Sequence, residues 1–281
     1  NIMAQLQINF LSESLMRTVT INAVIPFDKI RMPWEEAPKL KTPFKTLYLL
    51  HGIFGNYTDW ISGTNIQRWA EEKNLAVIMP SGENHFYMDC EANGERYSRF
   101  IGEELPRKMC ELFPLSTARE DTFIGGLSMG GFGAITNGLR YRERFGRIIG
   151  LSSALIFSDI CDPDSKDLGR SVFGSRFYET LLGPAEGFNG GPADYNALLD
   201  KAAADGEKPV FYLCCGVDDS LLGVNREFAD RVRAKGFTCT YEEGPGAHEW
   251  DFWNRYIKKV LDWLPLEEDT EGINSGNIGD R

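Results

Sequence analysis

The sequence predicts an α/β fold in which a mostly parallel central sheet carries helices on both faces. Three features lead to this prediction. Short apolar runs alternate along the chain with longer segments that repeat apolar residues at helical spacing. Several of these runs are apolar at nearly every position, as in strands buried on both faces. Two segments near the start of the chain instead alternate apolar and polar residues, which predicts antiparallel N-terminal strands.

The elements follow from these patterns in chain order. Antiparallel strands are predicted over 5–10 and 17–25, and further strands over 47–50, 75–79, 122–125, 147–151, 210–215 and 238–242. The predicted helices cover 65–73, 99–112, 132–140, 222–235 and 249–264. The last helix shows its pattern clearly, because its apolar stripe includes Trp250, Trp253 and Ile257.

These elements fit a single domain over residues 1–265, followed by a polar, acidic tail over 266–281. The chain has 281 residues, of which 42% are hydrophobic, and it contains no linker that would separate two folding units. It has no apolar stretch of about 18 residues that could span a membrane. The N-terminus shows no signal segment, and we expect Met3 to be the native start of a cytoplasmic protein.

A Gly-x-Ser-x-Gly pentapeptide at 126–130 is the strongest chemical signal in the chain. A predicted strand precedes it, and a helix with small residues near its start follows it. In this context the glycines allow a strained turn that exposes the Oγ of Ser128 above the sheet. Ser128 is therefore the candidate nucleophile of a serine hydrolase. The alternative is a glycine-rich turn with an incidental serine.

An acid is expected downstream, because α/β-hydrolases with this motif have the chain order Ser, Asp or Glu, His. The strand predicted over 210–215 is followed by Asp218 and Asp219, at the end of the strand where such an acid belongs. Spacing alone does not separate the two; we favour Asp219, and Glu243 is a weaker candidate. An acidic pair at a strand end can also be a solvated turn or a helix cap.

The base is chosen from only three histidines, His51, His85 and His248. His248 follows the acidic pair and lies in a Gly/Pro-rich loop between the last predicted strand and the last helix. We predict that His248 is the base; the alternative is a helix N-terminal residue without chemistry. His51 is in the wrong half of the chain for this order, and we expect it to hold a loop by hydrogen bonds.

Two backbone amides are expected to form the oxyanion hole. In such hydrolases one comes from the residue after the nucleophile and the other from the loop after an early strand, which indicates Met129 and Ile53. Phe54, His85 and Phe86 follow two predicted strands and are candidates for the substrate pocket.

The segment 152–208 is too long for a simple connection between two strands. It contains many aromatic residues and two short predicted helices, over 175–182 and 195–204. Inserted segments of this kind often cover the active site and select the acyl or leaving group. We expect a cap; the alternative is a surface elaboration remote from Ser128.

Several motifs in one order resemble the esterase D and tributyrin-esterase-like family, together with carbohydrate esterase family 1 and the S-formylglutathione hydrolases. The motifs are Leu-His-Gly at 50–52, the segment 56–60, Met-Pro-Ser-Gly at 79–82, Phe86, Tyr87 and Asp89, the segment 100–106, Gly-Leu-Ser-Met-Gly-Gly at 126–131, Cys-Gly at 215–216, Asp219 and His248. The resemblance covers nearly the whole chain. It implies one α/β-hydrolase domain, no metal or other cofactor, and hydrolysis of acetyl, butyryl or feruloyl esters, including esters of carbohydrates.

Carried over residue by residue, the resemblance assigns Ser128 as nucleophile, Asp219 as acid and His248 as base, with the amides of Met129 and Ile53 as oxyanion donors. One departure matters. The segment 51–55 differs from the Ser-Gly-Leu-Thr-Cys type of S-formylglutathione hydrolases, so the tributyrin and carbohydrate-esterase branch fits better. Thioester hydrolysis of the S-formylglutathione type and acyl transfer remain alternatives, and a catalytically inactive binding scaffold is the alternative from another class.

Charge and cysteine content argue against other classes of function. A net charge of −11 would repel nucleic acid and an anionic membrane surface. The six cysteines have no CxxC or Cys/His spacing, which argues against a zinc site and a disulfide framework. We expect a small-molecule or oligosaccharide ester as substrate, no metal, no nucleic acid or membrane partner, and association of subunits into a homo-oligomer.

Overall fold

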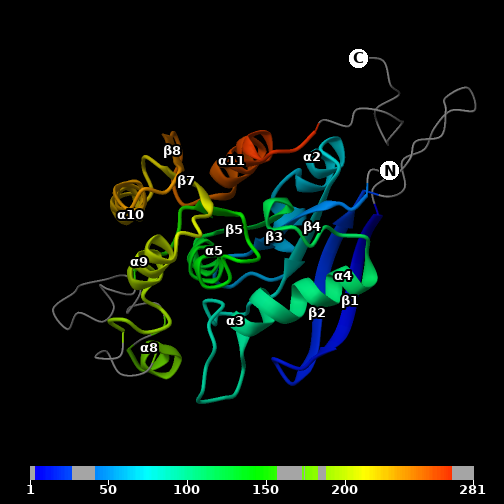
Figure 1. Ribbon diagram of the computed structural model, residues 1–281, viewed down its shortest axis with the longest axis horizontal. Coiled ribbons are helices and arrows are strands. Elements are labelled where there is room, and N and C mark those ends of the chain that lie inside the picture. The colour runs from blue at the N-terminus through cyan, green and yellow to red at the C-terminus, as the bar shows by residue number, and fades with distance from the viewer. Residues whose placement is uncertain (1–3, 27–41, 157–172, 174, 183–187, 268–281) are drawn as a thin grey trace, which may run out of the picture.

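The computed structural model describes residues 4–26, 42–156, 173, 175–182 and 188–267. Within them, strands form one sheet in the order β1-β2-β4-β3-β5-β6-β7-β8 (Figure 1). The first two strands, β1 (Ala4–Ser12) and β2 (Arg17–Ile25), pair antiparallel, and β2 is also antiparallel to β4 (Leu75–Pro80). The predicted antiparallel N-terminal strands are thus confirmed.

The remaining pairs of neighbouring strands are parallel. After β4, each strand pairs with the next in the order β3 (Lys45–Leu50), β5 (Thr122–Leu127), β6 (Arg147–Leu151), β7 (Val210–Gly216) and β8 (Cys239–Gly244). The carboxyl ends of parallel neighbours lie at one edge of the sheet, so the loops that follow them come together there.

The central strands are buried on both faces, and their alternating side chains enter two different cores. In β3, Tyr48 and Leu50 belong to the core on one face of the sheet, which we call core A. Leu47 and Leu49 belong to the core on the other face, core B. Successive side chains of a strand point to opposite faces, so a strand between two cores is apolar at every position. This is why these strands show no apolar-polar alternation in the sequence.

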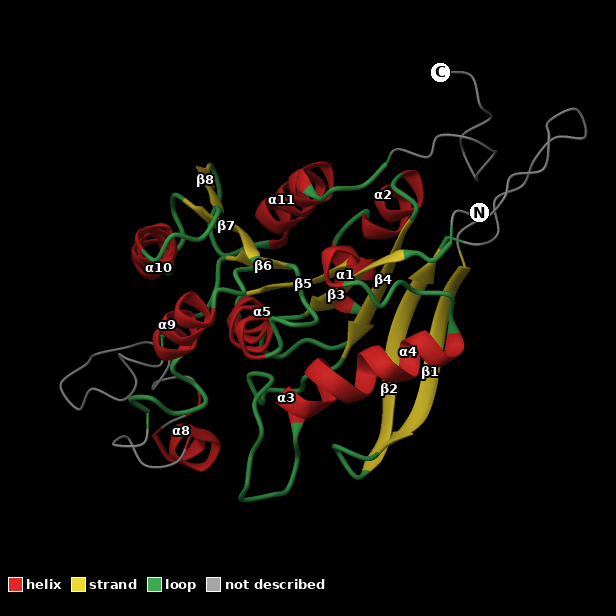
Figure 2. Cartoon of the chain, viewed as in Figure 1, coloured by secondary structure: helices red, strands yellow, loops and turns green. Residues whose placement is uncertain are grey.

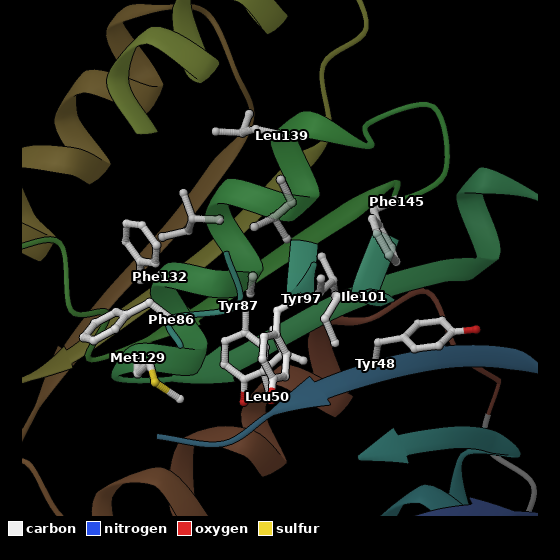
Figure 3. Packing of buried hydrophobic residues seen from close by; sticks show 14 of the residues in the cluster. Tyr48, Leu50, Phe86, Tyr87, Tyr97, Ile101, Met129, Phe132, Leu139 and Phe145 are labelled. Atoms are coloured by element: carbon white, nitrogen blue, oxygen red, sulfur yellow. The ribbon is translucent and has the colours of Figure 1, made fainter. Parts of the chain in front are cut away.

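Helices cover both faces of the sheet, as predicted (Figure 2). The helices that contribute to core A include α4 (Leu105–Leu112), α5 (Met129–Arg140), α9 (Tyr195–Asp205) and α10 (Leu222–Ala234). Those that contribute to core B are α1 (Asp59–Gly63), α2 (Ile66–Glu72) and α11 (Trp250–Trp263). Figure 3 shows part of core A, where Phe132 of α5 lies beside Phe86. No helix in the described part of the chain is long and apolar enough to cross a membrane.

The long connection after β6 contains two described helices at the predicted places, α8 (Ser175–Leu182) and α9. Leu199 of α9 is fully buried in core A, and the hydroxyl of Tyr195 donates to the carbonyl of Leu155 at 3.0 Å. Residues 157–172, 174, 183–187 and 268–281 lie outside the described residues. The expected cap and most of the acidic tail are therefore still predictions.

The helix predicted over 99–112 is interrupted near its start. A short turn, α3 (Tyr97–Arg99), leads into a π-helical turn over Phe100–Glu104, and α4 begins after it. Pro106 is the physical reason, because a proline ring collides with the carbonyl four residues earlier and has no N–H to donate. A wider π turn at that point relieves the collision.

The π turn ends at Glu104, which binds the turn between β1 and β2. Its carboxylate accepts hydrogen bonds from the Ser12 hydroxyl at 2.9 Å and from the amides of Glu13 and Ser14 at 2.8 and 2.9 Å. Burial by itself raises the pKa of Glu104, but these hydrogen bonds outweigh it and hold the pKa below its ordinary value. The ionised form therefore stabilises the fold above the ordinary glutamate pKa of about 4.3, and this stability is lost as the pH falls through the lowered pKa.

Replacing Glu104 by Gln should lower the free energy of unfolding by about 2 kcal/mol at neutral pH, because charge-assisted hydrogen bonds are lost. Urea unfolding should also show that this deficit shrinks as the pH falls below the ordinary glutamate pKa. Glu103→Gln is the matched control, since the Glu103 side chain is 54% exposed, and it should change the free energy by less than about 0.5 kcal/mol. Equal losses in the two variants would contradict this role for Glu104.

Candidate active site

Ser128 occupies the sharp turn between β5 and α5. Its backbone has φ 53° and ψ −119°, a region that residues with side chains rarely adopt. The Ser128 amide donates to the carbonyl of Leu151 at 2.9 Å, and its carbonyl accepts from the amide of Ala154 at 3.0 Å. These two bonds to the end of β6 hold the strained residue. The helix α5 begins at Met129, three residues before the predicted start at 132.

The glycines of the pentapeptide are required because backbones approach each other closely around Ser128. A Cβ at Gly126 would lie 2.3 Å from the carbonyl oxygen of Gly130, and a Cβ at Gly130 would lie 2.4 Å from the carbonyl oxygen of Leu50. A Cβ at Gly52 would lie 3.5 Å from the Cβ of Ser128. The start of α5 therefore packs directly on the end of β3, and the loop after β3 lies beside the serine.

His248 bridges Ser128 and Asp219. Its Nε2 lies 2.9 Å from the Oγ of Ser128, and its Nδ1 lies 2.9 Å from the Oδ2 of Asp219. A carboxylate can only accept, so Nδ1 carries the proton and Nε2 is free to accept the proton of the serine hydroxyl. The structure thus brings together three residues that are far apart in the sequence, each at the carboxyl end of a strand or in the loop after it.

The side chain of Asp219 is completely buried, whereas Asp218 is exposed. Burial alone raises the pKa of the Asp219 carboxyl, but hydrogen bonds from His248 and from the amide of Leu221 outweigh it and keep the pKa below its ordinary value. Glu243 forms an ion pair with Arg226 through two contacts of 2.8 Å. Of the three acidic candidates, Asp219 is the one that contacts His248.

His51 holds the loop that carries Ile53. The side chain is buried; its Nδ1 donates to the carbonyl of Gly52 at 2.6 Å, and its Nε2 accepts from the amide of Gly82 at 2.8 Å. The hydroxyl of Tyr87 donates to the His51 carbonyl at 3.0 Å. Burial lowers the pKa of His51, in keeping with a neutral ring that accepts at one nitrogen. As expected from the sequence, His51 has hydrogen bonds that fix this loop.

The three pocket candidates lie in different surroundings. Phe54 follows Ile53, is 71% exposed, and has its ring centroid 5.6 Å from that of Phe173. Phe86 is 2% exposed and belongs to core A (Figure 3). The Nε2 of His85 lies 3.2 Å from the carboxylate of Glu95. Phe54 is therefore the candidate with a large exposed surface beside the loop of Ile53.

Sequence reasoning missed Ser152, which lies at the end of β6 beside these groups. Trp253 of α11 was assigned only to an apolar stripe, yet its Nε1 donates to the Oγ of Ser152 at 3.2 Å. A signal for Ser152 did exist, since it follows a predicted strand parallel to the strand before Ser128, and the ends of such strands share one edge. Among the described residues, no group of three or more His, Cys, Asp or Glu side chains is arranged to hold a metal ion.

The sheet topology and the turn at Ser128 define the α/β-hydrolase fold. The family model Esterase, described as "Putative esterase", matches residues 29–264. An acetyl esterase of Caldicellulosiruptor saccharolyticus is 41% identical over 268 residues, which cover 95% of this chain and 100% of the relative. The chain belongs to this esterase family and is a carboxylic ester hydrolase.

Two solved structures from Staphylococcus aureus are similar over most of their length. Fluorophosphonate-binding serine hydrolase F, with substrate bound, is 29% identical with a TM-score of 0.80, covering 94% of this chain and 99% of that chain. An S-formylglutathione hydrolase, in its apoenzyme form, is 30% identical with a TM-score of 0.77 and the same coverage of 94% and 99%. Both support the fold and the enzyme class.

Gly126→Ala should destabilise the protein, because the new Cβ would lie 2.3 Å from the Gly130 carbonyl oxygen and backbone would have to move. We expect a loss of about 2 kcal/mol, seen as a lower midpoint of thermal unfolding. Gly223→Ala in α10 is the matched control, since a Cβ there meets no atom of the described residues within 4 Å, and it should not lower the midpoint. An unchanged midpoint for Gly126→Ala would show that the close approach is not a constraint.

Proposed function

We propose that this protein hydrolyses short-chain acyl esters, acetyl esters in particular, through an acyl-enzyme formed on Ser128. The observation that carries the proposal is the position of His248, whose two ring nitrogens each lie 2.9 Å from a partner, the Ser128 hydroxyl and the Asp219 carboxylate. This is the arrangement of nucleophile, base and orienting acid that serine hydrolases use. The 41% identical acetyl esterase supports the choice of acyl group.

The proposed reaction has two halves. In the first, His248 accepts the proton of Ser128 while the Oγ bonds to the ester carbonyl carbon, and the carbonyl π electrons move to its oxygen. Collapse of this intermediate breaks the bond to the alcohol, which leaves with the proton from His248. In the second half a water molecule attacks the acyl-serine in the same way, and the acid product and free Ser128 are formed. Asp219 remains ionised and stabilises the imidazolium.

The negative oxygen of the intermediate needs donors that are already in place. We assign this role to the amides of Met129 and Ile53. Met129 is the first residue of α5, where backbone N–H groups have no partner within the helix and the helix dipole favours negative charge. Ile53 lies in the loop that His51 fixes and that packs beside Ser128. Donors held by the fold in this way need no reorganisation during the reaction.

Aromatic rings beside Ile53 are proposed to contact larger acyl groups as well. Phe54 is largely exposed on the loop after β3, its ring lies 5.6 Å from that of Phe173, and Phe173 stacks at 4.5 Å on Phe177 of α8. These rings are suited to butyryl or feruloyl groups, and α8 belongs to the segment that we propose as the cap. The alcohol half is proposed to be a small molecule or a carbohydrate. A panel of p-nitrophenyl esters of increasing length, with methyl ferulate, ranks these groups by kcat/KM.

Hydrolysis of S-formylglutathione is the second candidate function. The 30% identical hydrolase of Staphylococcus aureus favours it, and a thioester would use the same serine, base and oxyanion donors. A kcat/KM for S-formylglutathione above that for every ester of the panel would make thioester hydrolysis the main activity.

Ser128→Ala should lower the turnover of p-nitrophenyl acetate by at least about a thousandfold, because the variant has no nucleophile to form the acyl-enzyme. The midpoint of thermal unfolding should stay close to that of the wild type, which separates loss of chemistry from loss of fold. Turnover close to the wild-type rate would overturn the proposed mechanism.

Asp219→Asn should lower turnover by about a thousandfold or more, because an amide favours the wrong tautomer of His248 and does not stabilise its positive charge. Asp218→Asn is the matched control, since the neighbouring side chain is exposed, and it should change turnover by less than about threefold. The opposite ranking would assign Asp218 as the acid.

A further inference from the structure

Ser152 is a buried serine in a strained conformation at the end of β6. It is 0% exposed, and its φ of 46° lies in the left-handed region that favours glycine. Its backbone is nevertheless well held, because its amide donates to the carbonyl of Cys214 at 2.8 Å. Glycine would relieve this strain but would lack the hydroxyl group.

The hydroxyl of Ser152 lies among groups of the active site. Its Oγ accepts a hydrogen bond from the Nε1 of Trp253 at 3.2 Å and lies 3.9 Å from the Sγ of Cys215, whose thiol is a weak donor. A buried hydroxyl hydrogen also requires an acceptor. Burial raises the pKa of Asp219, and a side-chain hydrogen bond from Ser152 is among the contacts that lower it below its ordinary value, which makes the Asp219 carboxylate the candidate acceptor.

Trp253 extends this network to the base. Its ring meets the imidazole of His248 edge to face, with the centroids 4.9 Å apart and the planes at 89°. The same indole donates to Ser152, so the hydroxyl holds the ring that packs on His248. The backbone beside Ser152 also supports the nucleophile, because the carbonyl of Leu151 accepts from the amide of Ser128 at 2.9 Å.

We propose that Ser152 is a positioning residue, whose hydroxyl holds the Asp219 carboxylate and, through Trp253, the imidazole of His248 in the geometry that accepts the Ser128 proton. The inference rests on the proposed function, because it concerns the same three groups. Asp219 has no exposed side-chain surface, so its orientation depends on the donors that the protein supplies: His248, the amide of Leu221 and, in this proposal, Ser152.

Three variants distinguish the role of the Ser152 hydroxyl from the effect of its backbone conformation. Ser152→Ala removes the hydroxyl and keeps the Cβ, whereas Ser152→Gly removes the hydroxyl and relieves the strain at φ 46°. Ser153→Ala is the matched control, because the neighbouring Ser153 is equally buried and its Oγ has no hydrogen-bond partner among the described residues. A purely conformational role for residue 152 predicts that Ser152→Gly keeps full activity.

Steady-state kinetics with p-nitrophenyl acetate test the proposal. We expect Ser152→Ala and Ser152→Gly each to lower kcat by about tenfold or more, with KM within about twofold of the wild type, since a charge-assisted hydrogen bond is lost and the binding surface is unchanged. Ser153→Ala should retain wild-type kcat. Trp253→Phe, which keeps a ring but removes the donor, should lower kcat by a smaller factor. Wild-type kcat in Ser152→Gly would overturn the proposal.

A double-mutant cycle distinguishes positioning of Asp219 from a general effect on the fold. If Ser152 acts through Asp219, adding Ser152→Ala to Asp219→Asn should cost less than about threefold, because the group that it holds is already altered. A full further tenfold loss would contradict the proposal. The two proposals can fail independently. The proposed function fails if the wild-type protein has no esterase activity that depends on Ser128. The positioning role alone fails if the wild-type protein is active and Ser152→Ala has the same kcat as Ser153→Ala.

Discussion

The candidate active site depends on the pair of hydrogen bonds at the His248 imidazole, and the fold has to place both partners of this ring. One small ring has to lie 2.9 Å from a hydroxyl and 2.9 Å from a carboxylate at the same time. The adjacent parallel strands β5, β6, β7 and β8 make this possible, because their carboxyl ends share one edge of the sheet. Ser128 follows β5, Asp219 lies just after β7, and His248 lies in the loop after β8.

β6 carries none of these three residues, yet its end contacts Ser128 and the helix that follows His248. The carbonyl of Leu151 accepts from the amide of Ser128, and the residue after β6, Ser152, accepts from the indole of Trp253 in α11. Non-glycine residues with positive φ also gather at this edge of the sheet, in the loops that follow β3, β4, β5 and β6. Two well-packed cores on opposite faces of the sheet supply the stability that offsets such local strain.

Much of this was predictable from the sequence, and the remainder depended on distances that a sequence does not contain. Continuous apolar runs predicted the buried parallel strands, and the pentapeptide with a histidine-poor composition predicted Ser128 and His248. Spacing left Asp218 and Asp219 equivalent; burial separates them. Phe86 is still a predicted pocket residue; its ring packs on α5 in core A, and its backbone has a left-handed conformation.

The most direct test of the central claim is to find which residue reacts covalently with an active-site reagent. The wild-type protein would be incubated with a fluorophosphonate and digested, and the modified peptide would be sequenced by mass spectrometry. The geometry at His248 predicts a single adduct on the Oγ of Ser128, because this hydroxyl lies 2.9 Å from a base and at the start of helix α5. An adduct on another residue, or no adduct in folded protein, would contradict the account.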